Sequence, residues 1–161
     1  GTLGSGCFGT VKRCRNKVDG AVYAVKIMGC NDRKNINEVR AMAVLSNKEC
    51  SNIVRYHHSW IEGRQLYMVM EWCETSLRPL LEEHKKSHRY FSEGELKSIL
   101  QDTLKALSEL HQYQVVHLDV KPENILKTFA GGTNLLILGC ADRLYSPTGR
   151  RSVRAMVSTW Q

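Results

Sequence analysis

The sequence lacks the features of several large classes of protein. No apolar run among its 161 residues approaches the roughly 18 residues that a membrane-spanning helix needs. It holds no internal repeat and no low-complexity tract, and its composition is typical of a globular protein. It begins without a methionine or a signal-peptide pattern, so we expect it to start inside a domain. At about one ordinary domain in length, it is long enough to bury a core.

The six cysteines do not follow the pattern of a metal site. They stand at positions 7, 14, 30, 50, 73 and 140, and no two form a C-x-x-C pair, which argues against structural zinc. The chain is also too long and too poor in cysteine for a disulfide scaffold. We therefore expect free thiols in a reducing compartment. We also expect an intracellular location, in the nucleus, the cytoplasm or both.

The chain carries a surplus of basic residues without the arrangement of a nucleic-acid-binding surface. Lysine and arginine total 23 against 16 acidic residues, a formal net charge of +7. The basic residues are dispersed, apart from four arginines between positions 143 and 154, and no basic–aromatic repeat occurs. This favours a solvated surface with some residues that meet phosphate over a surface for nucleic acid or an anionic membrane.

Hydrophobic periodicity divides the chain into a strand-rich half and a helix-rich half. The first half predicts strands over 22–27, 53–56 and 66–70, a turn at Gly63 and a helix over 35–46. This order suggests two lobes, with the join near the segment from Glu71 to Cys73.

A long helix is predicted to begin at Ser92. Ser92 and Glu95 form an S-x-x-E capping box, in which each bonds the other's free backbone N–H, and Phe91 and Leu96 are placed as a hydrophobic staple. A polar loop and a short apolar strand, Leu135 to Leu138, follow. One helix face carries six apolar residues that we expect to be core: Leu96, Ile99, Leu100, Leu104, Leu107 and Leu110.

A glycine-rich segment near the start of the chain is suited to phosphate binding. Gly4, Gly6, Gly9 and Val11 match G-x-G-x-x-G-x-V, and glycines let backbone N–H groups approach phosphate closely. The pattern alone also fits a Rossmann turn or a chance glycine hairpin. A Rossmann turn would lead into a helix, whereas this segment leads towards the strand at 22–27. The order favours a β-hairpin folded over a nucleotide.

Lys26 follows Ala24 and Val25 in a strand, in the manner of a lysine that binds the α- and β-phosphates of ATP. Glu38, twelve residues later on the predicted helix, is its natural carboxylate partner. A lysine on a strand is by itself usually a surface residue. The glycine-rich segment before it makes phosphate binding the stronger interpretation.

The segment from His117 to Asn124 carries the most specific signal. Its sequence, H-L-D-V-K-P-E-N, fits the protein-kinase catalytic loop H-x-D-x-x-x-x-N. In that pattern Asp119 accepts the proton of the substrate hydroxyl, Lys121 steadies the γ-phosphoryl group and Asn124 holds Mg²⁺. A polar turn after a helix would not explain why this octet follows the glycine segment and Lys26 in kinase order.

These motifs together resemble the Wee and Myt family of mitotic-inhibitor kinases, over residues 4–126. The resemblance rests on Leu118, where most kinases have arginine, and on the segments 38–45, 53–60 and 91–97. The kinases of translation initiation factors share the R-Y-x-x-x-W pattern and are the nearest competitor, but they typically carry arginine at position 118. Because leucine cannot pair with phosphate, we do not expect activation through a phosphorylated activation loop.

The resemblance implies a two-lobed α+β fold and ATP-dependent phosphoryl transfer to a protein hydroxyl, with ATP and Mg²⁺ as cofactors. Its implied substrate is a cyclin-dependent kinase, phosphorylated chiefly on tyrosine, and no nucleic-acid partner is expected. Met70 would be the gatekeeper beside a hinge at Glu71 to Cys73. The implied ATP-binding residues are Gly4, Gly6, Gly9, Val11, Ala24, Lys26, Glu38, Met70, Glu71 and Cys73.

The kinase pattern fails after the last predicted strand. By strand register Gly139 stands where a kinase has the metal-binding aspartate of D-F-G, and Asp142, three residues later, is the remaining candidate ligand. We therefore expect a nearly complete N-lobe over 1–72, the start of a truncated C-lobe over 73–138, and a tail of uncertain origin over 139–161.

Three interpretations of this tail stay open. The tail is an artefact of the sequence, the chain is a true fragment with an unusual metal motif, or it is a pseudokinase or scaffold that binds nucleotide or a partner without catalysing. The intact motifs before it favour the first two. We expect these residues alone to be inactive and the parent protein to be an active kinase.

Overall fold

The computed structural model describes residues 2–6, 9–46, 48 and 50–137. Gly139 and Asp142, on which the expected metal position and its alternative ligand fall, lie outside the described residues, as does the expected tail. None of the described helices is long and apolar enough to cross a membrane.

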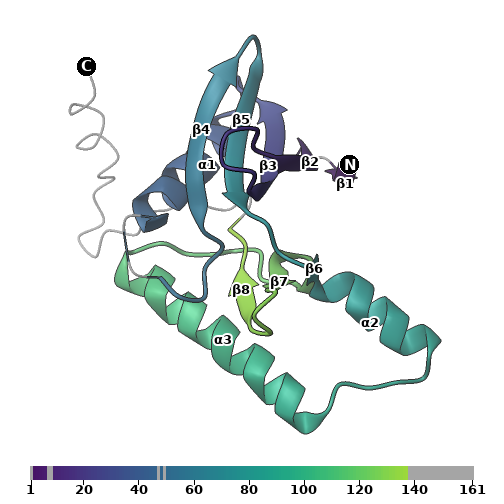
Figure 1. The fold of residues 1–161 in the computed structure, drawn as a ribbon. Coiled ribbons are helices and arrows are strands. Elements are labelled where there is room, and N and C mark those ends of the chain that lie inside the picture. Colours follow the sequence, from purple (N-terminus) through teal and green to yellow (C-terminus); the bar gives the residue numbers. More distant parts are fainter. Residues whose placement is uncertain (1, 7–8, 47, 49, 138–161) are drawn as a thin grey trace.

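The first half of the chain forms a five-stranded antiparallel sheet with one helix. The sheet order is β1-β2-β3-β5-β4, and Figure 1 shows α1 lying against the sheet. The elements are β1 (Thr2–Gly6), β2 (Gly9–Arg15), β3 (Val22–Gly29), α1 (Arg33–Ser46), β4 (Tyr56–Glu62) and β5 (Gln65–Glu71). The strands expected at 22–27 and 66–70, the helix at 35–46 and the turn at Gly63, with a φ of +59°, are confirmed.

The strand expected at 53–56 is wrong, because β4 begins only at Tyr56. Ile53 forms a single parallel bridge with Leu135 in the second half of the chain. The Val54 N–H donates to the carbonyl of Leu135 at 3.0 Å, and the Leu135 N–H donates to the carbonyl of Asn52 at 2.8 Å. Ile53 and Val54 are buried because they join the two halves of the molecule, not because they belong to the large sheet.

The second half is built from helices and a small three-stranded sheet, in the order β6-β7-β8. Its elements are β6 (Thr75–Ser76), α2 (Leu77–Lys86), α3 (Glu93–Gln112), a 3₁₀ turn (Pro122–Asn124), β7 (Ile125–Lys127) and β8 (Thr133–Leu135). The strand expected from Leu135 to Leu138 is therefore wrong, since β8 ends at Leu135 and Leu138 lies outside the described residues.

The start of α3 confirms the predicted capping box. The Glu95 N–H donates to the hydroxyl of Ser92 at 3.3 Å, and the Ser92 N–H donates to the Glu95 carboxylate at 2.7 Å. The backbone and side-chain hydrogen bonds from Ser92 lower the pKa of Glu95. The first turn of α3 is thus fixed by residues next to it in the sequence.

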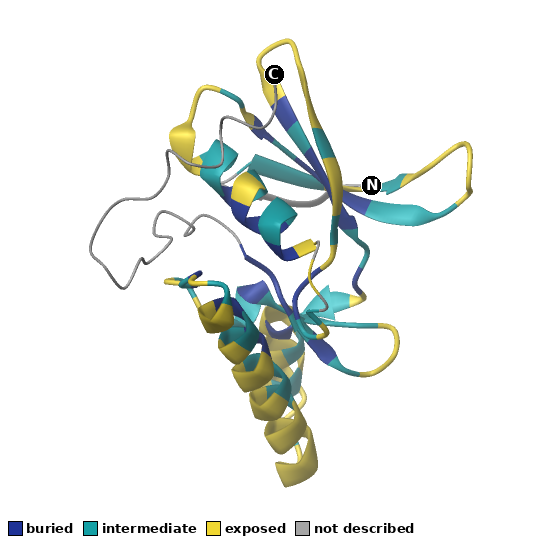
Figure 2. Cartoon of the chain, turned by 90° about the vertical axis from the view of Figure 1, so that its left-hand side faces the viewer, coloured by how far each residue is buried: buried dark blue, intermediate teal, exposed yellow. Residues whose placement is uncertain are grey.

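The apolar face of α3 is buried only near its C-terminal end. Leu110 is fully buried, but Leu96, Leu100 and Leu104 are 48%, 62% and 63% exposed. Figure 2 shows exposed residues along much of this long helix. The expectation that all six apolar residues are core is therefore wrong for these three leucines. β8 packs against α3, where Asp102 in the middle of the helix accepts hydrogen bonds from the N–H and hydroxyl of Thr133.

One buried cluster runs through both halves of the chain. Met42 of α1 and Met68 of β5 belong to the same cluster as Leu110 of α3, Leu135 of β8 and Ile137. The glycine-rich strands and the catalytic loop are thus carried on one continuous core, which fixes them relative to each other.

Candidate active site

The glycine-rich segment forms the predicted β-hairpin. β1 and β2 pair antiparallel, with Gly6 opposite Gly9, and no helix follows them, which excludes the Rossmann alternative. Gly9 has a φ of +107°, and a Cβ at this position would lie 2.3 Å from the carbonyl oxygen of Ile27. Only glycine fits where β2 passes this close to β3.

The sheet register aligns the predicted ATP-binding residues. Gly4 stands opposite Val11, Val11 opposite Lys26, and Ala24 opposite Met70. Residues directly opposite each other in a sheet share a face, and residues two apart along one strand share it as well. The structure therefore brings these five residues to one face of the sheet. Their contacts with ATP stay a prediction.

Lys26 and Glu38 form the predicted ion pair. The Lys26 Nζ lies 2.6 Å from the Glu38 Oε1, and the two side chains are 2% and 1% exposed. Lys26 points from β3 towards α1, where Glu38 is one of the buried residues of the helix. A buried charge needs such a partner, so the pair fixes α1 against the sheet.

The predicted hinge connects β5 to β6. The Glu71 carboxylate accepts hydrogen bonds from the Arg55 N–H at 3.2 Å and from the Asn134 amide at 2.7 Å, which ties the hinge to β8. Burial, and then the nearby Glu71 charge, raise the pKa of the Cys73 thiol to about 12. Met70 is buried at the end of β5, and its role as gatekeeper stays a prediction.

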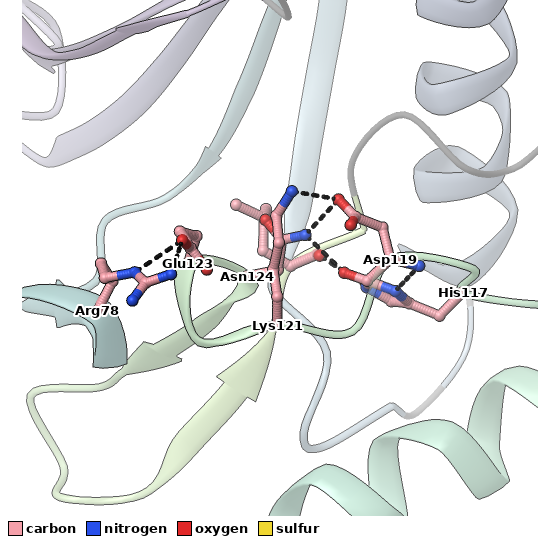
Figure 3. Close-up of polar contacts among 7 residues, drawn as sticks. Arg78, His117, Asp119, Lys121, Glu123 and Asn124 are labelled. Atoms are coloured by element: carbon pink, nitrogen blue, oxygen red, sulfur yellow. Dashed lines mark hydrogen bonds and ion pairs between the residues drawn. The ribbon is translucent and has the colours of Figure 1, made fainter. Parts of the chain in front are cut away.

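Lys121 and Asn124 of the catalytic loop converge on the carboxylate of Asp119 (Figure 3). The Lys121 Nζ lies 2.7 Å from the Asp119 Oδ2. The Asn124 amide donates to the same oxygen at 3.1 Å and to the Asp119 carbonyl at 2.8 Å. The hydrogen bond from Lys121 is the largest cause of a lowered pKa at Asp119. Asp119 is thus held as a carboxylate, the form that can accept a proton.

His117 connects this loop to the end of β8. Its Nε2 lies 2.9 Å from the carbonyl oxygen of Leu136, and its Nδ1 accepts the Asp119 N–H at 3.3 Å. Between these residues Leu118 has a φ of +32°, a conformation that a side chain rarely adopts, and it is 64% exposed. Leu118 thus stands at a tight turn between the buried His117 (2% exposed) and Asp119.

The sequence did not point to Arg78, which pairs with Glu123 from 45 positions away. The Arg78 Nη2 lies 2.7 Å from the Glu123 Oε1, and the two side chains are 50% and 39% exposed. Glu123 stands between Lys121 and Asn124, so this contact joins the first turn of α2 to the catalytic loop. Glu123 was visible within the octet, whereas no local pattern marks Arg78.

The described residues fit only part of a two-metal kinase site. Asn124 donates from its amide nitrogen, which leaves its amide oxygen as the atom that could bind Mg²⁺. Asp119 is the carboxylate beside it. Within residues 2–6, 9–46, 48 and 50–137 no group of three or more His, Cys, Asp or Glu could hold a metal ion. The described part of the chain does not supply the second metal carboxylate.

Comparison with known proteins agrees with this arrangement. The pattern of the family described as "Protein kinase domain" matches residues 1–160. The Wee1-like protein kinase of Arabidopsis thaliana is 40% identical over 149 residues, covering 88% of this chain and 28% of the relative. Wee1-like protein kinase 1-B of Xenopus laevis is 36% identical over 130 residues, covering 76% of this chain and 22% of the relative.

Human Wee1-like protein kinase 2 is 38% identical over 130 residues, covering 76% of this chain and 23% of the relative. The chain thus spans about a quarter of the length of these curated relatives. The resemblance to Wee-type kinases found in the sequence is confirmed. Because the family pattern covers nearly all of its residues, the chain belongs to the protein kinase domain family.

Proposed function

We propose that the protein carrying this chain is an ATP-dependent protein kinase that phosphorylates a cyclin-dependent kinase on tyrosine. The observation that carries the proposal is the convergence of Lys121 and Asn124 on the Asp119 carboxylate, at 2.7 and 3.1 Å. The glycine hairpin and the Lys26–Glu38 pair, supported by the same core, add the parts that bind phosphate. ATP and Mg²⁺ are the proposed cofactors.

The proposal gives each side chain a separate task. Lys26 is oriented by Glu38 to hold the α- and β-phosphates of ATP. Asp119, kept ionised by Lys121, accepts the proton of the substrate hydroxyl as this oxygen attacks the γ-phosphorus. Lys121 is close enough to Asp119 to place its ammonium beside the transferred phosphoryl group, while Asn124 holds the carboxylate in position.

The substrate and the location rest on the family resemblance. Wee1-like names among the relatives favour a protein substrate, and a cyclin-dependent kinase is the one that the resemblance implies. We also propose a location in the nucleus or cytoplasm, and no nucleic-acid partner. The exposed Leu118 favours a kinase that does not use a phosphorylated activation loop, because leucine offers no charge for phosphate.

A second candidate function is a nucleotide-binding module without turnover. It is favoured by the missing second metal carboxylate in the described part of the chain. The two candidates share the glycine hairpin and Lys26, and they differ in whether Asp119 performs chemistry.

Phosphorylation of a purified cyclin-dependent kinase by the full-length protein, followed with labelled ATP and phosphotyrosine detection, tests the proposal. We expect turnover, and a loss of about 10²–10⁴-fold with Asp119→Asn, the range for removal of a general base. Asp19→Asn, in the exposed turn before β3, is the matched control and should leave turnover unchanged. Nucleotide binding without turnover in the unaltered protein would favour the second candidate.

A further inference from the structure

One side-chain contact joins the second strand of the glycine hairpin to the hinge. The guanidinium of Arg13, on β2, lies over the ring of Trp72 in the hinge, with its Cζ 5.6 Å from the ring centroid. This separation is within the range of a cation–π interaction. In the described part of the chain no carboxylate forms an ion pair with Arg13. The indole is therefore the partner that the structure gives to this charge.

The contact belongs to the face of the sheet that carries the predicted ATP-binding residues. Arg13 stands opposite Ala24 of β3, and Ala24 stands opposite Met70 of β5. Two residues earlier on β2, Val11 stands opposite Lys26. Residues opposite each other share a face, and so do residues two apart along one strand. Since Lys26 marks the phosphate end of the proposed site, Arg13 and Ala24 mark the other end, where the base would lie.

The contact adds a direct connection that the sheet does not supply. In the order β1-β2-β3-β5-β4, the hairpin strand β2 is separated from β5, and so from the hinge that follows it, by β3. Trp72 is half-buried and packs against the cluster that runs through both halves of the chain, whereas Arg13 is exposed. The indole is thus held by the core, and the guanidinium links the hairpin to it across β3.

We propose that Arg13 is a positioning residue for the nucleotide, because its contact with Trp72 fixes the glycine hairpin relative to the hinge. These are the two parts of the proposed site that would enclose ATP between them. The inference rests on the proposed function, because it concerns the same nucleotide site. It adds a residue outside the glycine motif that sets the affinity for ATP without taking part in phosphoryl transfer.

This role predicts a particular kinetic pattern. Arg13 acts at the base end of the site, away from Asp119 and Lys121, so it should hold ATP equally well before and during the transfer. Loss of such an interaction raises KM and leaves kcat unchanged. A cation–π contact at an exposed position changes an equilibrium by about two- to fivefold. The expected change is therefore small, but it is confined to the binding of ATP.

The experiment compares three substitutions in the full-length protein, with ATP affinity measured by calorimetry in Mg²⁺ and kcat by initial rates at saturating ATP. Arg13→Met keeps the apolar stem, removes the charge and should weaken ATP binding about two- to fivefold at unchanged kcat. Arg13→Lys keeps a cation over the ring and should retain most of the affinity. Arg15→Met is the matched control on the same strand, where the guanidinium donates to the Gly20 carbonyl, and should leave affinity unchanged.

A double-mutant cycle tests whether Arg13 acts through the indole. In a Trp72→Leu background, Arg13→Met should have little further effect on ATP affinity, because the contact is already lost. A full two- to fivefold loss in that background would show that the two residues act independently and would overturn the inference.

Two other results would also decide against it. Arg13→Met that binds ATP as tightly as the unaltered protein would overturn the inference and leave the proposed function standing, as would Arg13→Lys that binds as weakly as Arg13→Met. Absence of ATP binding to the unaltered protein would overturn the nucleotide site of the proposed function and the inference with it. Should Trp72→Leu fail to fold by circular dichroism, the three variants at the exposed Arg13 and Arg15 decide the matter.

Discussion

Lys26 and Glu38 stand twelve residues apart in the sequence, yet the Lys26 Nζ and the Glu38 Oε1 are 2.6 Å apart in a site closed to solvent. The lysine comes from the middle of β3 and the glutamate from the inner face of α1. A pair of this kind can hold a helix in one position and release it when broken. In this structure the pair is formed, and it connects α1 to β3.

Glu38→Gln should destabilise the domain by about 3–5 kcal/mol, because it leaves the Lys26 ammonium buried without its counter-charge. Denaturant unfolding of the single variant measures this loss. Replacing both residues with apolar side chains, Lys26→Met with Glu38→Leu, should recover most of it, since an apolar pair has no charge to compensate. A double variant as unstable as Glu38→Gln would show that the pair is not the source of the effect.

Gly9→Ala should be more destabilising than an alanine at another glycine with positive φ. Gly63 has a φ of +59° and nothing within 4 Å of an added Cβ. Gly63→Ala should therefore lower the free energy of unfolding only by the cost of a left-handed backbone at alanine, about 1–2 kcal/mol. At Gly9 the contact with the Ile27 carbonyl should add about 1–3 kcal/mol of overpacking. Equal unfolding midpoints for the two variants would argue that β2 moves freely away from β3.

Lys121→Met should raise the pKa of Asp119 towards its ordinary value, since the hydrogen bond from Lys121 is the largest cause of its lowering. A lowered carboxyl pKa stabilises the fold above the ordinary aspartate pKa, and this stabilisation is lost as pH falls through the folded value. At neutral pH this stabilisation of the fold by Asp119 is therefore fully present. Carboxyl NMR titration measures the shift, with Lys127→Met, near Glu74, as the control. An Asp119 pKa unchanged by Lys121→Met would contradict the assignment.

The 161-residue chain by itself should bind a hydrophobic dye through the exposed leucines of α3. Replacing Leu96, Leu100 and Leu104 with serine should remove most of the dye fluorescence and keep the circular dichroism, because none of the three is buried. Leu110→Ala, in the buried part of the same helix, should instead cost about 2–5 kcal/mol of unfolding free energy. Dye binding that survives the serine substitutions would place the apolar surface elsewhere.

The parts of this structure that the sequence predicted are those fixed by near neighbours. The capping box joins Ser92 to Glu95 within one turn, and the glycine hairpin follows from an eight-residue motif, so both could be predicted from the sequence. The octet at 117–124 named Asp119, Lys121 and Asn124 because their spacing is itself the signal.

The parts that were missed depend on contacts between distant segments. The apolar residues at 53–56 suggested a strand of the large sheet. Their composition could not show that Ile53 instead forms a bridge with Leu135, which lies 82 residues later in the sequence. The period of α3 marks an apolar face but not which portion of it is covered. The Arg78–Glu123 pair has no local signature, since each residue alone is an ordinary surface charge.

The two hydrogen bonds of Leu136 have an evolutionary consequence. Because the Leu136 N–H donates to the Asn124 carbonyl at 2.8 Å and the Leu136 carbonyl oxygen lies 2.9 Å from the His117 Nε2, both contacts use main-chain atoms. Any residue at position 136 except proline, which lacks the N–H, can make them. The framework that holds the catalytic loop is thereby independent of which side chain stands at this position. Substitutions at position 136 can therefore accumulate while the loop around Asp119 keeps its geometry.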